Sequence, residues 1–150
     1  MMQNIHFKAP NCWINDPNGF IWYKGQYHLF YQCFPYAPQW GRMHWGHAVS
    51  KDLVNWEEKG IALYPTKTDD RSGCFSGSAV EQDGTLYLFY TGVNYLEENP
   101  EDINQCRNDQ FLAAQMMISS DDGMTFDNVK RKKTVIPPIT EKQIGSKTNT

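Results

Sequence analysis

The sequence of 150 residues has little net charge and no long apolar run, and each shortage excludes a class of protein. The formal net charge is −3, so no broad positive surface is expected to attract nucleic acid or an anionic membrane. The single basic run, at residues 130–133, lies next to polar residues and is interpreted as a solvated face. No apolar stretch approaches the roughly 20 residues that a membrane-spanning helix needs.

Cysteine is scarce and scattered, because Cys12, Cys33, Cys74 and Cys106 form no C-x-x-C pair. We therefore expect structural thiols in a reducing compartment rather than a disulfide or a metal site. The start of the chain, MMQNIH at residues 1–6, has no apolar core after a basic head and does not resemble a signal peptide. Together these two observations predict a cytoplasmic protein.

Helical periodicity is missing from almost the whole chain, whereas strand patterns recur. Residues 25–31 (GQYHLFY) place a glycine turn before a β-prone aromatic run, and residues 84–90 (GTLYLFY) repeat this pattern 59 positions later. Residues 47–56 align with residues 117–126 at an offset of 70, which requires an insertion of eleven residues. The polar stretch 97–105 is the predicted place of this insertion, as a surface loop.

Each repeat is predicted to hold four strands: a short one, an aromatic one, a third, and an outer one that ends near Trp56 or Phe126. Such units, repeated every several tens of residues, are typical of propeller blades. The sequence thus predicts an all-β chain with blade one at about 13–68 and blade two at about 73–136. Two blades cannot close a ring. Residues 1–150 are therefore expected to be the N-terminal portion of a propeller domain, with the remaining blades and any C-terminal β-sandwich absent.

The aromatic strand of the first repeat is apolar on both faces, with Tyr27, Leu29 and Tyr31 on one face and Phe30 on the other. This pattern fits a sheet sandwiched between neighbouring blades rather than a sheet with one wet face. An ordinary β-sandwich with accidental self-similarity is the alternative.

The most distinctive motif is WINDPNG at residues 13–19. Read locally, its Asp-Pro-Asn-Gly part has the composition of a tight hairpin turn. In a propeller, however, Asp16 follows a short strand at the start of blade one, and the innermost strand of a blade lines the central channel. The carboxylate of Asp16 is then expected to face a common pocket instead of bulk water.

WINDPNG resembles the signature of glycoside hydrolase family 32, the invertases, fructanases and sucrose-6-phosphate hydrolases, although the family usually has Met in place of Ile14. Further segments resemble family motifs in the same order: WGHAVS at 45–50, DLVNW at 52–56, CFSGSA at 74–79 and YTG at 90–92. The resemblance extends from about residue 6 to residue 136. It implies a five-bladed β-propeller and the retaining hydrolysis of β-D-fructofuranosides.

Retaining hydrolysis uses two carboxyl groups about 5–5.5 Å apart, one as nucleophile and one as general acid. The resemblance assigns Asp16 as the nucleophile that forms a covalent fructosyl-enzyme, which water then hydrolyses. The family's general acid, a Glu in a Glu-Cys motif, and its Arg-Asp-Pro motif have no counterpart in these residues. Both are expected beyond Thr150, so the chain alone is expected to be inactive. The implied mechanism uses no cofactor.

The resemblance also assigns substrate-binding roles. Asn15 and Gln32 match positions that hydrogen-bond the fructose hydroxyls, and a neutral amide both donates and accepts. The alternatives are a hydrogen-bonding cap on the sheet for Gln32 and ordinary core positions for the aromatic residues. The complete predicted site consists of Asp16 as the catalytic residue with Trp13, Ile14, Asn15, Gln32, Trp40, Phe75 and Ser76 as substrate-binding residues.

His44 and His47 have the H-x-x-H spacing of a metal site on a helix. On a strand, residues three apart point to opposite faces, so no metal site is predicted. Residues 43–47 instead resemble this stretch in bacterial sucrose-6-phosphate hydrolases, where the family often has Pro in place of Arg42. Arg42 is either a ligand for a substrate phosphate or, as we prefer, a solitary surface cation.

The predicted function is that of a β-fructofuranosidase of the sucrose-6-phosphate hydrolase type. Its predicted partner is a small sugar: sucrose, sucrose 6-phosphate or a fructan. One alternative is another five-bladed glycosidase, such as an arabinofuranosidase or xylosidase, and another is a carbohydrate-binding propeller without catalysis. The sequence predicts no oligomeric state.

Overall fold

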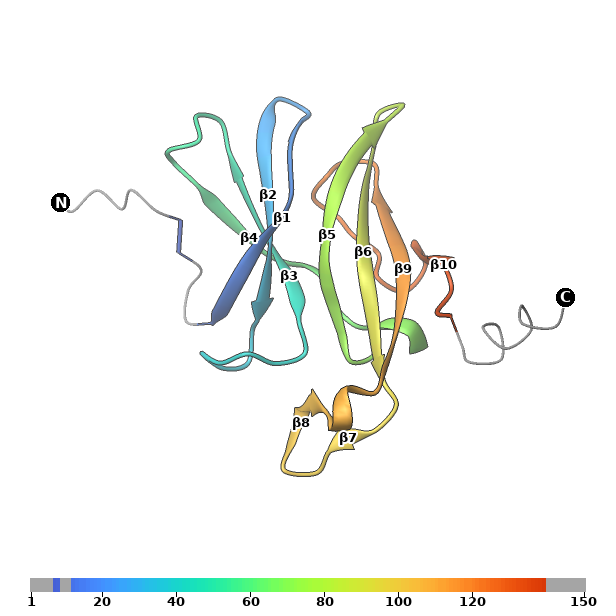
Figure 1. Cartoon of the computed structure of the whole chain (residues 1–150). Coiled ribbons are helices and arrows are strands. Elements are labelled where there is room, and N and C mark those ends of the chain that lie inside the picture. The colour runs from blue at the N-terminus through green and yellow to red at the C-terminus, as the bar shows by residue number, and fades with distance from the viewer. Residues whose placement is uncertain (1–6, 9–11, 140–150) are drawn as a thin grey trace, which may run out of the picture.

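The computed structural model describes residues 7–8 and 12–139, which form two four-stranded antiparallel sheets and a small hairpin (Figure 1). The first sheet has the order β1 (Trp13–Tyr23), β2 (Gln26–Phe34), β3 (His44–Ser50), β4 (Glu57–Leu63). The second has the order β5 (Gly73–Gln82), β6 (Thr85–Tyr95), β9 (Phe111–Ser120), β10 (Lys132–Ile136). The hairpin pairs β7 (Glu98–Asn99) with β8 (Asp102–Cys106), and the 3-10 turns are η1 (Thr68–Asp70) and η2 (Arg107–Asp109). None of the described elements is a helix long and apolar enough to cross a membrane.

The two sheets repeat one hairpin at the predicted offset of 59 residues. Lys24 and Gly25 join β1 to β2, and Asp83 and Gly84 join β5 to β6. All four residues have positive φ, from 45° to 82°. Two-residue hairpin loops favour this conformation because it matches the twist of the strands, and it is the reason for a glycine at each second position.

The prediction for the outer strands was wrong. Each third strand ends in a turn built on one aspartate, and the outer strands β4 and β10 begin only after it. Asp52 Oδ1 accepts the N–H groups of Val54 and Asn55 at 2.9 and 2.7 Å. Asp122 Oδ1 repeats these bonds to two backbone N–H groups at 2.8 and 2.7 Å. The predicted alignment of residues 47–56 with residues 117–126 was correct. The second half of each segment, however, is a turn stabilised by side-chain acceptors and not a strand. The first strands are also longer than predicted, at eleven residues for β1 and ten for β5.

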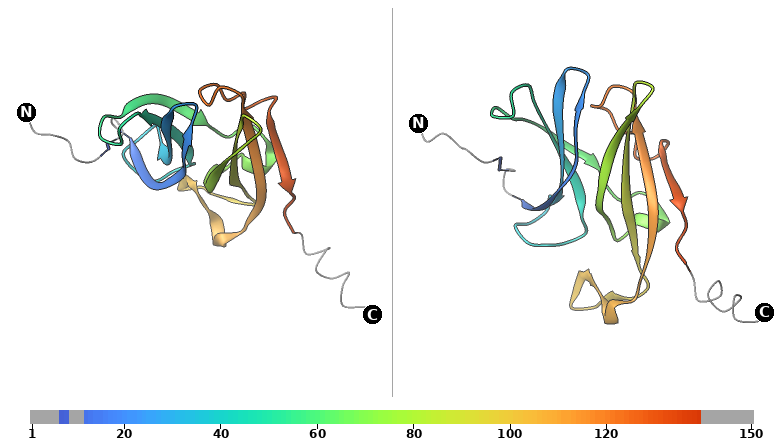
Figure 2. Two further views of the ribbon diagram at one scale, coloured as in Figure 1. Left: turned by 90° about the horizontal axis from the view of Figure 1, so that it is seen from above. Right: turned by 45° about the horizontal axis from the view of Figure 1, so that its top comes forward.

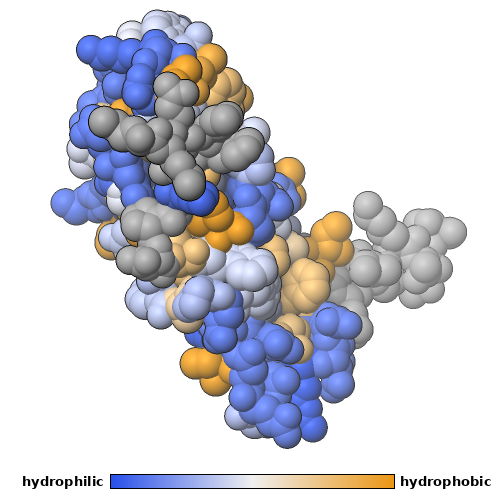
Figure 3. Space-filling model, turned by 90° about the vertical axis from the view of Figure 1, so that its left-hand side faces the viewer, coloured by the Kyte–Doolittle hydropathy of each residue, from blue (hydrophilic) through white to orange (hydrophobic). Residues whose placement is uncertain are grey.

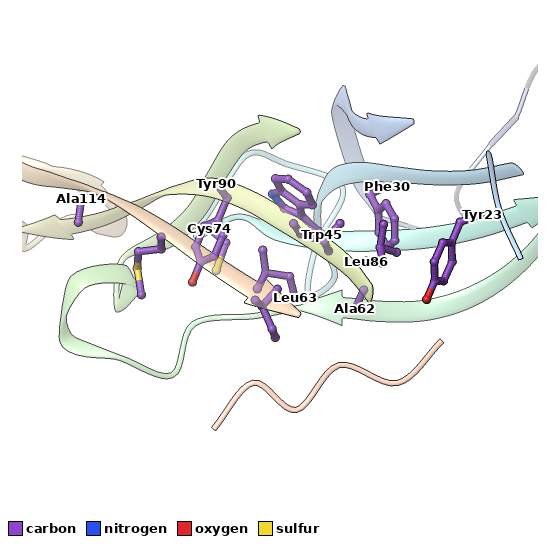
Figure 4. Close-up of a cluster of buried hydrophobic side chains, with 12 residues drawn as sticks. Tyr23, Phe30, Trp45, Ala62, Leu63, Cys74, Leu86, Tyr90 and Ala114 are labelled. Carbon is purple, nitrogen blue, oxygen red and sulfur yellow. The ribbon is translucent and has the colours of Figure 1, made fainter. Parts of the chain in front are cut away.

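Apolar side chains cover both faces of the first sheet, as predicted. Phe30, Trp45 and Leu63 pack against the second sheet, where Leu86 and Tyr90 belong to the same buried cluster (Figure 4). On the opposite face a second cluster forms around three buried side chains, with further partly buried ones packed against it: Tyr31, Cys33 and Ala48, with Phe7, Cys12, Leu29 and Trp56. The first sheet therefore has apolar side chains on both faces, as expected of a sheet that lies between neighbouring blades.

The outer surface beside the first sheet is mixed in character. Figure 3 views the molecule from that side and shows hydrophobic side chains in small separate groups among hydrophilic ones. Phe20 and Trp22 of β1 are both more than half exposed.

The insertion between β6 and β9 is a folded hairpin rather than the predicted surface loop. It lies beyond the lower ends of the two large sheets in Figure 1 and is seen again in both views of Figure 2. Arg42, in the loop between β2 and β3, binds this hairpin. The guanidinium of Arg42 contacts a carboxylate oxygen of Glu98 at 2.6 Å and donates to the carbonyl oxygen of Ile103 at 3.0 Å.

A buried ion pair joins the segment between the two sheets to the last strand. Lys132 Nζ lies 2.7 Å from Asp70 Oδ2, and neither side chain has exposed surface. The other carboxylate oxygen, Asp70 Oδ1, accepts the backbone N–H groups of Thr66 and Lys67 at 2.9 and 2.7 Å. The hydroxyl of Tyr90 donates to Asp70 Oδ2 at 2.8 Å. The Asp70 carboxylate therefore connects the segment between the two sheets to β10 and β6.

Candidate active site

A β-bulge in β1 presents the central residues of the WINDPNG motif. Ile14 pairs with Cys33 and Pro17 pairs with Tyr31, so Asn15 and Asp16 together face the single residue Gln32. Bulges next to active sites re-aim side chains, and Pro17 is tolerated directly after this bulge because β1 is an edge strand of its sheet. The motif therefore lies inside a strand, and the reading of it as a hairpin turn was wrong.

The second sheet has a bulge at the equivalent place. Cys74 pairs with Gly92 and Gly77 pairs with Tyr90, which leaves Phe75 and Ser76 opposite one residue of β6. The two bulges are offset by 60 residues, one more than the hairpins. β1 has a further bulge after Asn18, and this shifts the alignment by one position. An alignment at the offset of 59 therefore does not match Asp16 with Ser76, although the two residues occupy equivalent positions in the two bulges.

The strands β1 and β5 bring the two bulges together. A Cβ atom at Gly19 would lie 3.1 Å from the Cβ of Ala79, so only glycine allows this approach without a shift. The buried side chain of Asn18 links the same strands, because its Oδ1 accepts the N–H of Gly77 at 3.4 Å. The sequence alone predicts no role for Asn18, and its place inside the WINDPNG motif is the only signal that could have indicated one.

Asp16 and Ser76, which occupy equivalent positions of the two repeats, form a direct hydrogen bond. The Ser76 hydroxyl donates to Asp16 Oδ2 at 2.6 Å, which holds the carboxylate in one orientation. Asp16 is exposed, and among the described residues Oδ1 has no hydrogen-bond donor. One oxygen is therefore held and the other is available to an incoming group.

A chain of amide hydrogen bonds lies beside the carboxylate. Trp13 Nε1 donates to Asn15 Oδ1 at 3.0 Å, and Asn15 Nδ2 donates to Gln32 Oε1 at 2.5 Å. These bonds fix which end of each amide accepts and leave the Gln32 amide nitrogen to donate elsewhere. Gln32 is only 3% exposed, so its orientation is set by the sheet around it.

Aromatic rings form the other wall. Trp40 and Phe75 meet edge to face with their ring centroids 6.1 Å apart. Trp45, which the sequence does not mark as a site residue, donates from Nε1 to the carbonyl oxygen of Phe75 at 3.1 Å and thereby stabilises the bulge. Ile14 is 37% exposed and contributes no polar group. The predicted residues therefore form three sets. Hydrogen bonds join Asp16 to Ser76 and join Trp13, Asn15 and Gln32 in a chain, and Trp40 and Phe75 form a ring pair. Ile14 lies between Trp13 and Asn15 in the sequence.

The histidines of the H-x-x-H spacing lie in separate environments, as predicted for a strand. His47 Nε2 lies 3.0 Å from His28 Nδ1, whereas His44 Nδ1 lies 2.9 Å from the carbonyl oxygen of Arg42. Arg42 is paired with Glu98 rather than solitary. Within residues 7–8 and 12–139 no three His, Cys, Asp or Glu side chains gather as a metal site would require, and all four cysteines are free thiols.

Acid is expected to destabilise the fold through the buried histidines. Burial, with the neighbouring charges of His28 and Lys59, lowers the pKa of His47 to about 3, and burial also lowers the pKa of His28. The unfolded chain binds these protons near pH 6.5 and the folded chain does not. The stabilisation is therefore complete above pH 6.5 and declines as the pH falls, by up to about 1.4 kcal/mol per pH unit for each histidine.

This expectation is checked by urea unfolding between pH 7.5 and pH 5, above the range in which most carboxylates titrate. The His47→Gln variant should show a shallower decline in the free energy of unfolding than the parent. Equal slopes for the two proteins would contradict it.

Two consecutive four-stranded antiparallel sheets that pack on each other, each with its first strand innermost, have the form of two neighbouring blades of a β-propeller. Comparison with known proteins identifies the particular family. Residues 6–148 match the family described as the glycosyl hydrolases family 32 N-terminal domain, and the chain belongs to that family. The predicted class, all-β with the five-bladed propeller of this family, is thereby confirmed, with the chain forming part of the propeller.

Relatives and solved structures agree with this assignment. The chain is 47% identical over 138 residues to sucrose-6-phosphate hydrolase of Zymomonas mobilis, and 44% identical over 135 residues to raffinose invertase of Escherichia coli. These alignments cover 90% and 89% of the chain but only 25% and 26% of the relatives. The structure of the Bombyx mori family 32 β-fructofuranosidase superposes with a TM-score of 0.72 at 37% identity, covering 92% of this chain and 26% of that one. The chain therefore spans about a quarter of the length of the proteins it matches.

Proposed function

We propose that a full-length protein carrying this chain hydrolyses β-D-fructofuranosides, sucrose or sucrose 6-phosphate, with retention of configuration. The observation that carries the proposal is the Asp16 carboxylate, held through Oδ2 by Ser76 with Oδ1 free, beside the amides of Asn15 and Gln32. Relatives point the same way, because they include sucrose-6-phosphate hydrolases, and a mutant of the Bombyx mori enzyme was solved in complex with sucrose.

In the proposed reaction Asp16 Oδ1 attacks C2 of the fructosyl unit, and the bond from C2 to the leaving oxygen breaks. The leaving oxygen takes its proton from a carboxylic acid supplied by another part of the protein. Water then attacks C2 of the fructosyl-enzyme, gives its proton back to that same carboxyl group, and releases Asp16 as a carboxylate. The Ser76 hydrogen bond holds the carboxylate of the nucleophile in place for this attack.

The binding roles follow from the same geometry. The free donor of Gln32 and the fixed amide of Asn15 suit sugar hydroxyls, which both donate and accept. Trp13, Trp40 and Phe75 offer flat apolar surface to the carbon side of the ring. The two alternatives, another five-bladed glycosidase and a carbohydrate-binding propeller, gain no specific support from these contacts.

The proposal is tested by assaying the full-length protein on sucrose, sucrose 6-phosphate, inulin and p-nitrophenyl α-L-arabinofuranoside. Hydrolysis of a fructoside, with NMR showing that the first fructose released keeps the substrate's anomeric configuration, is the expected result. Cleavage of the arabinoside alone would favour the other glycosidase. Binding of sugars without any cleavage would favour the non-catalytic propeller.

A further inference from the structure

The bulge that carries Ser76 is bonded to side chains of the first sheet on each side of this residue. On one side, Trp45 Nε1 donates to the carbonyl oxygen of Phe75 at 3.1 Å. On the other side, Asn18 Oδ1 accepts the backbone N–H of Gly77 at 3.4 Å. Ser76 lies between these two bonded residues. The place of its hydroxyl therefore depends on the first sheet as well as on its own strand.

Trp45 is itself held in one orientation. Its side chain has no exposed surface, and its ring centroid lies 6.4 Å from that of Phe30 and 6.2 Å from that of Tyr90 (Figure 4). On β3 it is the cross-strand partner of Gln32, and residues directly opposite in an antiparallel pair point to the same face of the sheet. An indole packed between the two sheets offers its N–H at one fixed place, so it is a rigid anchor for the carbonyl oxygen of Phe75.

Asn18 joins the strand of Asp16 to the strand of Ser76. It follows Asp16 by two residues on β1 and is only 2% exposed. The backbone that it binds is closely packed, because a Cβ atom at Gly77 would lie 1.9 Å from the carbonyl oxygen of Phe89 on β6. The N–H of Gly77 is thus presented by a segment that has little room to move, and the Asn18 amide fixes the distance between the two inner strands.

These two anchors reach the nucleophile through the Ser76 hydroxyl. Ser76 Oγ lies 2.6 Å from Asp16 Oδ2, and such a bond weakens steeply when its distance or angle changes. If the bulge shifts, the bond lengthens and the carboxylate is free to turn. A nucleophile that samples several orientations attacks less often, and a misplacement of about 1 Å can cost roughly 10²-fold in rate.

We propose that Trp45 and Asn18 are positioning residues for the hydrolysis: they fix the bulge so that the Ser76 hydroxyl holds Asp16 in the orientation for attack on C2. The inference rests on the proposed function. In this scheme neither side chain contacts the sugar, whose hydroxyls bind to Asn15 and Gln32. Loss of either anchor therefore lowers kcat and leaves KM nearly unchanged.

The first experiment replaces Trp45 with Phe in the full-length protein, which keeps an aromatic ring but removes the N–H bonded to Phe75. On the fructoside that the parent cleaves best, kcat is expected to fall about fivefold, the usual effect of one neutral hydrogen bond. Trp56→Phe is the matched control, because Trp56 Nε1 donates to the carbonyl oxygen of Leu53 at 3.2 Å in the turn between β3 and β4. It should leave kcat unchanged. A Trp45→Phe variant with the kcat of the parent, or with a change in KM alone, would overturn the inference.

The second experiment is a double-mutant cycle that separates positioning from a general loss of structure. Ser76→Ala is expected to lower kcat about tenfold, the lower end of the effect of a hydrogen bond to a charged group. Asn18→Ala should lower kcat about fivefold in the parent, but by less than about twofold once Ser76 is alanine. The bond through which Asn18 acts is then already missing. Trp45→Phe should lose its effect in the same way.

Asn128→Ala is the matched control for the cycle. Asn128 is also 2% exposed, and its amide donates to the carbonyl oxygen of Ala62 at the end of β4. This variant should melt at a lower temperature than the parent but keep the same kcat where it is folded. Equal effects of Asn18→Ala in both backgrounds, or a Ser76→Ala variant with the kcat of the parent, would overturn the inference. Failure of the parent to cleave any fructoside would instead overturn the proposed function.

Discussion

Replacing Asp16 with Asn in the full-length protein is expected to abolish sucrose hydrolysis, a loss on the order of 10⁵ in kcat, the scale seen when a nucleophile is removed. The amide of asparagine is a far poorer nucleophile than a carboxylate and forms no stable ester with C2. The fold should be unaffected, because Asp16 is exposed and the Oδ1 of asparagine still accepts from Ser76. Initial rates on sucrose, together with thermal unfolding of both proteins, check the two halves of this expectation.

The matched control for this substitution is Asp83→Asn in the turn between β5 and β6. Asp83 is exposed and has a φ of 52°, a conformation that asparagine also adopts. Its kcat should equal that of the parent. A comparable kcat for Asp16→Asn and the parent would remove Asp16 from the chemistry altogether.

Replacing Asp70 with Ala is expected to lower the free energy of unfolding by about 3–5 kcal/mol, the usual cost of leaving one partner of a buried ion pair alone. The ammonium of Lys132 would remain buried without its counter-charge, and the N–H groups of Thr66 and Lys67 would lose their acceptor. Urea unfolding followed by tryptophan fluorescence measures the change.

Two further variants separate the contributions at this position. Asp70→Asn keeps an acceptor for the backbone N–H groups but not the charge, so its loss should be smaller than that of Asp70→Ala. Glu101→Ala removes an exposed carboxylate and should change the free energy of unfolding by less than about 0.5 kcal/mol. A loss for Asp70→Ala as small as that of Glu101→Ala would show that the crossing between the sheets does not depend on the ion pair.

The repeat pattern predicted much of the fold because it is encoded locally. Gly25 and Gly84 mark equivalent hairpins, and the aromatic runs after them mark strands that are buried on both faces. The outer strands were misplaced because Asp52 and Asp122 end the third strands through side-chain bonds that no hydrophobic pattern records. The hairpin fold of the insertion was not predicted either, since it depends on contacts with the distant Arg42.

The candidate site was predictable in composition but not in geometry. The motifs name Asp16, Asn15 and Gln32, and the structure brings these side chains together, although their roles stay predictions. The bond between Asp16 and Ser76 could not be inferred from sequence, because it depends on how two separate sheets approach each other. The second bulge of β1, after Asn18, further disguised the correspondence between the two residues.

The inner strands β1 and β5 have an equivalent bulge but carry different side chains in it. The same bulge carries a carboxylate at Asp16 in one copy and a hydroxyl at Ser76 in the other, with 2.6 Å between their oxygens. A second carboxylate at this position would repel the first, whereas the hydroxyl of Ser76 donates a hydrogen bond to it. The difference between the two repeats at this position, a hydroxyl in one and a carboxylate in the other, is therefore itself a part of the candidate site.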